Sequence, residues 1–302
     1  MESGGTAGAE AAGREQGAVA LVGHLLRRCY QVHHQLWAEE IGDTLTPSQY
    51  SLLLTVAAAD AGLDQHTIGA GAGLDRSTTA GIVRRLKVYG WLKQSRDPRD
   101  GRRQVVSLAA PSAVALEGLA PAVANVQARL LRPVEGGDRG WLEDRLALVA
   151  DVGPRAQDRR PGHLLRLAQQ RHTALWAQEV GARLTGPQFA VLDVLRRDGD
   201  LGQGALAEAA AVDRSSASDV LGRLESRGWT ERSADPSDRR TRRVRLTPAG
   251  EDVLRAVHDP VLRVQERLLQ PVPAAEQERL VDLLGRVADG ASTSLAPGQG
   301  PQ

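Results

Sequence analysis

Two short turns in the sequence concentrate charged side chains. They read RDPRDGRR (residues 96–103) and ADPSDRRT (residues 234–241), and β-rich runs flank each turn, which predicts two hairpins. Arginine binds phosphate oxygens bidentately and suits the narrow, electronegative minor groove of DNA. The aspartates can pair with neighbouring arginines and hold them extended. The turns therefore predict contact with a nucleic-acid backbone, although a basic hairpin can also be a merely solvated surface.

Histidine and aromatic side chains form a second pattern with chemical potential. His33 and Trp37 are one helical turn apart and share a face, and His172 and Trp176 repeat the pair. A flat aromatic or anionic ligand could stack on such a tryptophan and accept a hydrogen bond from the histidine. The alternative is that the tryptophans only pack between the two halves of the chain. The candidate ligand-binding residues are Tyr30, His33, His34, Trp37, His172 and Trp176.

Metal and haem chemistry have weaker support in the sequence. His33 and His172 are possible ligands, but no spacing of histidine, cysteine and carboxylate residues is typical of a metal site. We therefore expect no metal and no cofactor. Cys29 is the only cysteine, and in an apolar helical setting it is more typical of an inert buried thiol than of an oxidation sensor.

Composition limits the classes of protein that the chain can be. Its 302 residues, 41% of them hydrophobic, are enough for two ordinary domains, and a net charge of +1 excludes a histone-like polycation. A single cysteine excludes an intrachain disulfide and fits a reducing compartment. The acidic, polar start is unlike a signal peptide, and no apolar run approaches the length of a membrane span. The expectation is a soluble cytoplasmic protein without a membrane partner.

The chain repeats itself over the length of a whole domain. His24 and His163 are 139 residues apart, as are Trp37 and Trp176, whereas Asp75 and Asp213 are 138 apart. A unit of this size indicates duplication of a domain and not a solenoid repeat. We expect a first domain at 18–152 and a second domain at 163–290, joined by a linker at 153–162. Disordered tails are expected at 1–17 and 291–302.

Both copies are expected to be mainly α-helical with one small β-hairpin each. In the first copy, Thr46 and Pro47 mark a helix start, Asp75 caps the following long helix, and Gly90 ends it. The helices of the first copy are expected at 18–41, 46–59, 67–73, 75–90, 112–131 and 138–151. Those of the second copy are expected at 161–181, 186–197, 204–211, 214–227, 249–269 and 274–289, with a hairpin at 229–246.

A short helix, a longer helix and a hairpin in this order predict a winged helix-turn-helix. The longer helix would present its first side chains to the major groove, and the hairpin tip would lie on the backbone or in the minor groove. The DNA-binding candidates of the first copy are Arg76, Ser77, Thr78, Thr79, Arg84, Arg85, Arg99, Arg102 and Arg103. Those of the second copy are Arg214, Ser215, Ser216, Ser218, Arg223, Arg239, Arg240 and Arg242.

The segments LDRSTTAGIVRRLKVYGWLKQSRDPRDGRRQVVSL and VDRSSASDVLGRLESRGWTERSADPSDRRTRRVRLTPAG resemble the recognition helix and wing of MarR-family regulators. LTPSQYSLLLTV and LTGPQFAVLDVL resemble the preceding helix of that family. The resemblance implies a homodimer-like arrangement through terminal helices, here fused into one chain as an intramolecular pseudo-dimer, with two half-sites on double-stranded DNA. It also implies a small, often aromatic, effector that modulates repression.

The two copies differ where the resemblance implies contact with DNA. Gly81 is matched by Asp219, whose charge would repel phosphate, and three glycines weaken the short helix of the first copy. The second wing is the more basic one, so we expect it to be the stronger DNA contact of the two.

Two functions stay open at this point. One is a ligand-responsive transcriptional regulator that acts as a monomeric pseudo-dimer, with further self-association possible. The other is a former regulator that binds, sequesters or transforms a small molecule without specific binding to DNA. No triad, P-loop or dinucleotide motif supports an enzyme.

Overall fold

The computed structural model describes residues 6–59, 61–96, 100, 102–153, 158–234 and 242–290. The predicted linker positions 154–157, both hairpin tips and the predicted tail 291–302 therefore lie outside the described residues or are only partly within them. No helix in the described part of the chain is long and apolar enough to cross a membrane. The helices and strands of the first copy are α1 (Thr6–Ile41), α2 (Pro47–Ala57), α3 (Gln65–Ala72), α4 (Arg76–Val88), β1 (Leu92–Arg96), β2 (Gln104–Leu108), α5 (Ala110–Leu130) and α6 (Gly136–Val149).

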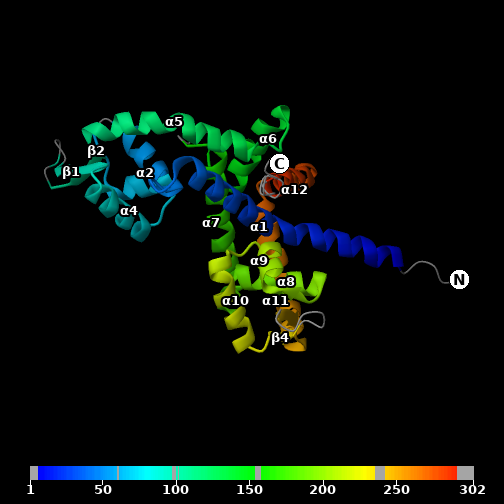
Figure 1. Cartoon of the computed structure of the whole chain (residues 1–302). Coiled ribbons are helices and arrows are strands. Elements are labelled where there is room, and N and C mark those ends of the chain that lie inside the picture. The colour runs from blue at the N-terminus through cyan, green and yellow to red at the C-terminus, as the bar shows by residue number, and fades with distance from the viewer. Residues whose placement is uncertain are drawn as a thin grey trace, which may run out of the picture. The chain divides into compact units, whose positions relative to one another are not determined.

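The second copy repeats this order of elements (Figure 1). They are α7 (Pro161–Glu179), the 3-10 helix η1 (Gly181–Arg183), α8 (Gly186–Asp198), β3 (Leu201–Gly202), α9 (Gln203–Ala209), α10 (Arg214–Ser226), β4 (Thr230–Ala234), β5 (Arg242–Leu246), α11 (Pro248–Leu269) and α12 (Ala274–Asp289). The predicted mainly α fold with two small hairpins is confirmed.

The first helix is longer than the sequence predicted. We expected it to begin at residue 18, after a disordered tail, but α1 begins at Thr6. Six of the fifteen residues from Thr6 to Ala20 are alanine, the strongest helix former, against three glycines, so the backbone can continue as a helix without an apolar stripe.

The compact units of the structure do not coincide with the sequence repeats. One unit, here called the first lobe, combines Tyr30–Ala168 with residues from Arg286 onward. The other, the second lobe, combines residues up to Cys29 with Gln169–Gly285. Because α1 and α7 are continuous helices that cross these boundaries, each lobe receives the start of the other copy's first helix.

The first lobe contains a complete winged helix (Figure 1). Its core is apolar and includes Leu52 of α2, Ile68 of α3, Leu86 of α4 and Val106 of β2, all almost fully buried. β1 and β2 pair antiparallel, and a single bridge joins Leu63 to Val106. The hairpin is thus fixed to the helices through its buried face, and its far end carries the charged turn.

The second lobe forms the same arrangement with one more strand. The short strand β3 pairs with β5, which pairs with β4, so the sheet order is β3-β5-β4. Val244 of β5 is 1% exposed and takes the place that Val106 has in the first lobe. The sequence did not indicate β3, because two residues are too few to show strand alternation.

Candidate nucleic-acid interface and ligand cavity

The recognition helix of the first lobe begins at a charged cap. The carboxylate of Asp75 accepts hydrogen bonds from the backbone N–H of Thr78 (2.9 Å) and from the hydroxyls of Thr78 (2.6 Å) and Ser77 (2.7 Å). These hydrogen bonds hold the pKa of Asp75 well below its usual range. Ser77 and Thr78 are exposed, as is Arg76, and the cap orients the side chains of Ser77 and Thr78, two of the predicted DNA-binding residues at the start of α4.

Thr79 does not belong to this exposed surface. Its side chain is 1% exposed and donates a hydrogen bond to the carbonyl of Asp75 (2.7 Å), which corrects the prediction that it contacts DNA. A Cβ on Gly69 would lie 2.7 Å from the Thr79 hydroxyl, so the buried threonine requires a glycine in α3. The second lobe has Ala207 and Ala217 at these two positions, both buried. The pair of glycine and threonine in the first lobe is thus replaced by a pair of alanines in the second, and both pairs fill the contact between the two helices.

The remaining predicted side chains of the first lobe are exposed where the structure describes them. Arg84 and Arg85 extend from the second half of α4, and Arg102 and Arg103 lie in the charged turn, just before β2. Arg103 pairs with Asp64, the cap of α3, at 2.7 Å. Arg99 lies outside the described residues.

The second recognition helix, α10, has a different balance of charge. Ser216, Ser218 and Arg223 are exposed, and Ser218 accepts a hydrogen bond from Gln203 (2.9 Å). Asp219 is also exposed. Of the described residues of the wing, Arg242 is exposed. The side chains of Arg214, Ser215, Arg239 and Arg240 lie outside the described part of the structure.

A cavity of about 810 Å³ lies within the second lobe. Aromatic and aliphatic side chains form much of its wall, including Trp176, Phe189 and Leu254, and the predicted ligand residue His172 lines it as well. The volume falls within the range of small-molecule sites. Tyr30, His33, His34 and Trp37 belong to the first lobe and do not line this cavity.

The polar lining of the cavity contains arginines of two kinds, some in ion pairs with a carboxylate and one without such a partner in the part of the chain that the structure describes. Arg196 and Arg197 both bind Asp193, at 2.7 and 3.3 Å. Arg27 lies deeper: burial lowers its pKa to about 10, and its Nε has no hydrogen-bond partner within the described residues. Gln265, 1% exposed, likewise has no partner there for its Oε1. Buried polar atoms in this state are suited to hydrogen bonding with a polar ligand that enters the cavity.

Two histidines add neutral polar groups to the wall. Burial lowers the pKa of His24 and of His172 to about 4, and the charge of Arg27 acts on both in the same direction. Both rings are therefore neutral at pH 7. Gly23 of α1 permits close packing here, because a Cβ at that position would overlap the His172 ring.

The sequence predicted only part of this site. His24, Arg27, Phe189 and Gln265 were missed as site residues, although the repeat of His24 as His163 was visible at the 139-residue spacing. The tryptophans also pack, each within its own lobe: the indole N–H of Trp37 donates to the Leu45 carbonyl (2.6 Å), and that of Trp176 donates to the Leu184 carbonyl (2.7 Å). Trp176 therefore serves both the core and the cavity.

The corresponding residues of the first lobe have partners within that lobe. Gln127, the counterpart of Gln265, accepts a hydrogen bond from the backbone N–H of Gly162 (2.9 Å) and lies 3.4 Å from the Nε2 of His33. Arg166, the counterpart of Arg27, donates to the carbonyls of Ala72 (2.5 Å) and Gly73 (2.9 Å) at the end of α3. Tyr30 and His34 contact each other edge to face, with ring centroids 4.6 Å apart.

Two helix-turn-helix units, each followed by a wing, and a cavity within the second lobe define a winged helix-turn-helix protein of the regulator class. Models of the MarR family match residues 43–103 and 184–241, one in each copy. The HTH-type transcriptional repressor NicR of Pseudomonas putida is 36% identical over 129 residues, covering 42% of this chain and 82% of that protein. The transcriptional regulator HosA of Escherichia coli is 38% identical over 125 residues, covering 41% and 92%.

The chain therefore belongs to the MarR family, with two family regions in tandem. Among solved structures, the PcaV transcriptional regulator from Streptomyces coelicolor is 40% identical and covers 43% of this chain and 93% of that one, at a TM-score of 0.41.

Proposed function

We propose that this chain is a DNA-binding transcriptional repressor whose operator binding is changed by a small aromatic acid in the cavity of the second lobe. Its relatives are named as transcriptional regulators, and NicR is named as a repressor. The two winged helices of one chain would do the work of the two subunits of a homodimer, so a single chain would read two half-sites. We call this arrangement an intramolecular pseudo-dimer.

Exposed charge supports the contact with DNA. Four basic side chains and no acidic ones lie along α4: Arg76, Arg84, Arg85 and Lys87. On α10, two basic residues are balanced by Asp219 and Glu225, and Glu225 pairs with Arg232 at 2.5 Å. In this proposal the first lobe grips DNA mainly through its recognition helix and the second mainly through its wing. The operator would then be asymmetric.

The observation that carries the ligand proposal is the state of Arg27 in the cavity. A buried guanidinium whose Nε has no hydrogen-bond partner among the described residues fits a carboxylate, which accepts charge-assisted hydrogen bonds from it. Trp176 and Phe189 offer aromatic surface for a ring, and their own ring centroids are 5.3 Å apart. The unpaired Oε1 of Gln265 would accept a hydrogen bond from a hydroxyl on that ring. Together these groups favour a hydroxylated aromatic monocarboxylate.

Isothermal titration calorimetry with matched acids and amides tests this proposal. We expect benzoate, 4-hydroxybenzoate or nicotinate to bind at least tenfold more tightly than the corresponding neutral amide, because only the acid can pair with Arg27. The acid that binds best should also release the protein from DNA taken from upstream of its own gene. Equal affinities for acid and amide would contradict the assignment of Arg27.

A second candidate function is a ligand-binding protein that no longer reads DNA. Asp219, exposed on the recognition helix of the second lobe, favours it because a carboxylate there repels phosphate. The variant Asp219→Gly, which restores the residue of the first copy, distinguishes the two. For a regulator we expect it to raise DNA affinity about threefold at 100 mM salt, whereas a protein without specific DNA binding should show no sequence-dependent gain.

A further inference from the structure

The first lobe contains a buried ionic cluster made by the segment that joins the two copies. The carboxylate of Asp158 lies 2.5 Å from Nη2 of Arg160 and 3.3 Å from Nδ1 of His163. The hydroxyl of Ser51 donates to the same carboxylate at 3.2 Å. The side chain of Asp158 is 9% exposed, so this linker residue belongs to the interior.

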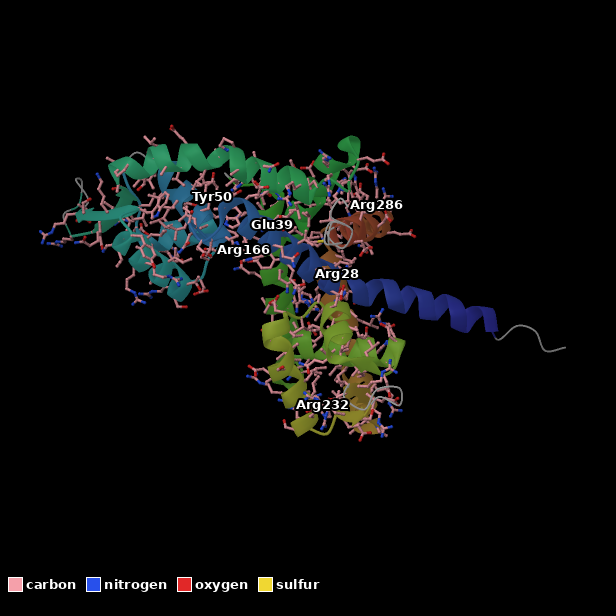
Figure 2. The ribbon with its side chains drawn as sticks, viewed as in Figure 1. Arg28, Glu39, Tyr50, Arg166, Arg232 and Arg286 are labelled. Carbon is pink, nitrogen blue, oxygen red and sulfur yellow. The ribbon has the colours of Figure 1, made fainter. Side chains whose placement is uncertain are left out.

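Arg160 completes the cluster with an aromatic contact. Its guanidinium carbon lies 4.7 Å from the centroid of the Tyr50 ring, a cation–π geometry. Figure 2 labels Tyr50 on α2 and Arg166 on α7, the two helices that also contribute Ser51 and His163 to the cluster. The linker thus places a carboxylate and a flat guanidinium against a tyrosine ring.

The internal repeat identifies the equivalent place in the second lobe. Tyr50, Ser51 and His163 correspond to Phe189, Ala190 and His24, and all three counterparts line the 810 Å³ cavity. The linker residues Asp158 and Arg160 correspond to Val19 and Leu21, which carry no charge. The charged pair of Asp158 and Arg160 therefore has no charged counterpart at the equivalent positions of the other copy.

The charges around Asp158 keep its carboxylate ionised, which is the state in which an acid would bind to an arginine. Burial raises the pKa of Asp158, but the hydrogen bond and charge of Arg160, together with His163, outweigh burial and leave the pKa lowered. Conversely, the Asp158 charge raises the pKa of His163 against the larger lowering caused by burial. The carboxylate is thus held ionised in a site whose counterpart offers a buried arginine.

We propose that the segment Asp158–Arg160 fills the site in the first lobe that corresponds to the cavity of the second lobe, and we call it a tethered occupant. The Asp158 carboxylate takes the place in the first lobe that the carboxylate of the effector takes in the second. The first lobe is then insensitive to effector, and the chain binds one aromatic acid, in the second lobe. This inference rests on the proposed function, because it assumes that the open cavity accepts an acid.

Stoichiometry of binding tests the proposal directly. Calorimetry with 4-hydroxybenzoate, or whichever acid of the panel binds best, should give one molecule per wild-type chain. The double variant D158V/R160L places the residues of the other copy in the linker, and it should bind two. The matched control is Arg159→Ala, which removes an arginine of the same segment whose guanidinium pairs with Asp144 (2.7 Å), outside the cluster; it should still bind one.

A second measurement avoids dependence on the folding of the double variant. The ¹⁹F spectrum of 4-fluorobenzoate with the wild-type chain should show one bound resonance, which Phe189→Tyr shifts and Tyr50→Phe leaves in place. Two acids per wild-type chain, or a folded D158V/R160L that still binds one, would overturn the tethered occupant while leaving the proposed function intact. No binding by any acid would instead contradict the proposed function and this inference with it.

Discussion

The two lobes derive from one sequence unit, yet they differ at the points where a regulator would sense and respond. In the first lobe Arg166 is bonded to the end of α3, and a linker carboxylate fills the neighbouring site. In the second lobe the equivalent Arg27 faces an open cavity. Fusion removes the requirement that both halves of a dimer be identical, so one half can keep the sensing site while the other loses it.

The same contrast appears in how helices begin. Asp75 caps α4 with three side-chain hydrogen bonds, whereas its counterpart Asp213 makes no side-chain capping hydrogen bond to the part of α10 that the structure describes. At the next helix of each lobe, the capped helix is the one in the second lobe. Thr247 caps α11 through the N–H of Gly250 (3.1 Å), but Ala109 has no side-chain oxygen with which to cap α5. Local stability is therefore distributed differently in the two lobes.

The largest expected effect is a difference in affinity for the aromatic acid between variants of the two buried arginines, Arg27 and Arg166. Arg27→Met should weaken binding of the aromatic acid at least 30-fold, since it removes a buried partner of the carboxylate, worth about 2 kcal/mol or more. Arg166→Met should leave that affinity within twofold while lowering the melting temperature, because the carbonyls of Ala72 and Gly73 lose their donor. Calorimetry and thermal melts measure both. Equal losses of affinity in the two variants would show that the lobes do not differ as described.

The next effect concerns the recognition helices. R84A/R85A removes two exposed cations from α4 and should weaken DNA binding about tenfold at 100 mM salt. The slope of log affinity against log salt should become shallower by about 0.9 for each phosphate that these cations no longer neutralise. Arg223→Ala on α10 should cost about threefold, and anisotropy titrations at several salt concentrations compare the variants. A larger loss of affinity with Arg223→Ala would make the second helix the main point of attachment to DNA.

A double-mutant cycle tests the packing exchange in the helix-turn-helix. Gly69→Ala should destabilise the protein by about 1 kcal/mol or more, because the added Cβ meets the Thr79 hydroxyl. Adding Thr79→Ala should recover most of that loss, because the second lobe already carries the Ala207 and Ala217 pair. Denaturant unfolding gives the coupling energy, expected at about 1 kcal/mol. Additive effects would mean that the two positions do not constrain each other.

The smallest expected effect is at the start of α5. Ala109→Thr supplies the cap that Thr247 gives to α11 and should stabilise the first lobe by about 0.5–1 kcal/mol, measured by thermal or urea unfolding. The matched change Thr247→Ala should cost about 1 kcal/mol. No change from either substitution would show that these caps do not contribute to the difference between the lobes.

The sequence predicted the elements well because their signals are local. Thr46 caps α2 at the helix start that the Thr–Pro pair indicated, with a capping box to Gln49, and Asp75 caps α4 as expected. The exchange of helix starts between lobes was not predictable, because a repeat records duplication and not which segments pack together. Thr79 was misplaced for a related reason: its neighbours on the helix are exposed, and only the approach of α3 at Gly69 buries it.

The ligand site was predicted only where residues lie on one helix face. His172 and Trp176 share a face of α7 and do line the cavity, but Arg27 and Gln265 come from α1 and α11, far apart in sequence. Nothing in the spacing of Asp158 and Arg160 shows that the linker enters the interior. Such contacts depend on the tertiary arrangement.

Fluorescence anisotropy of the whole chain on duplex DNA from upstream of its own gene tests the central claim most directly. A scrambled duplex, several salt concentrations and a titration with the best-binding aromatic acid complete the measurement. The account predicts tight, sequence-selective binding with a steep salt dependence, and release as one equivalent of acid binds per chain. Weak, unselective binding that the acid does not alter would contradict it.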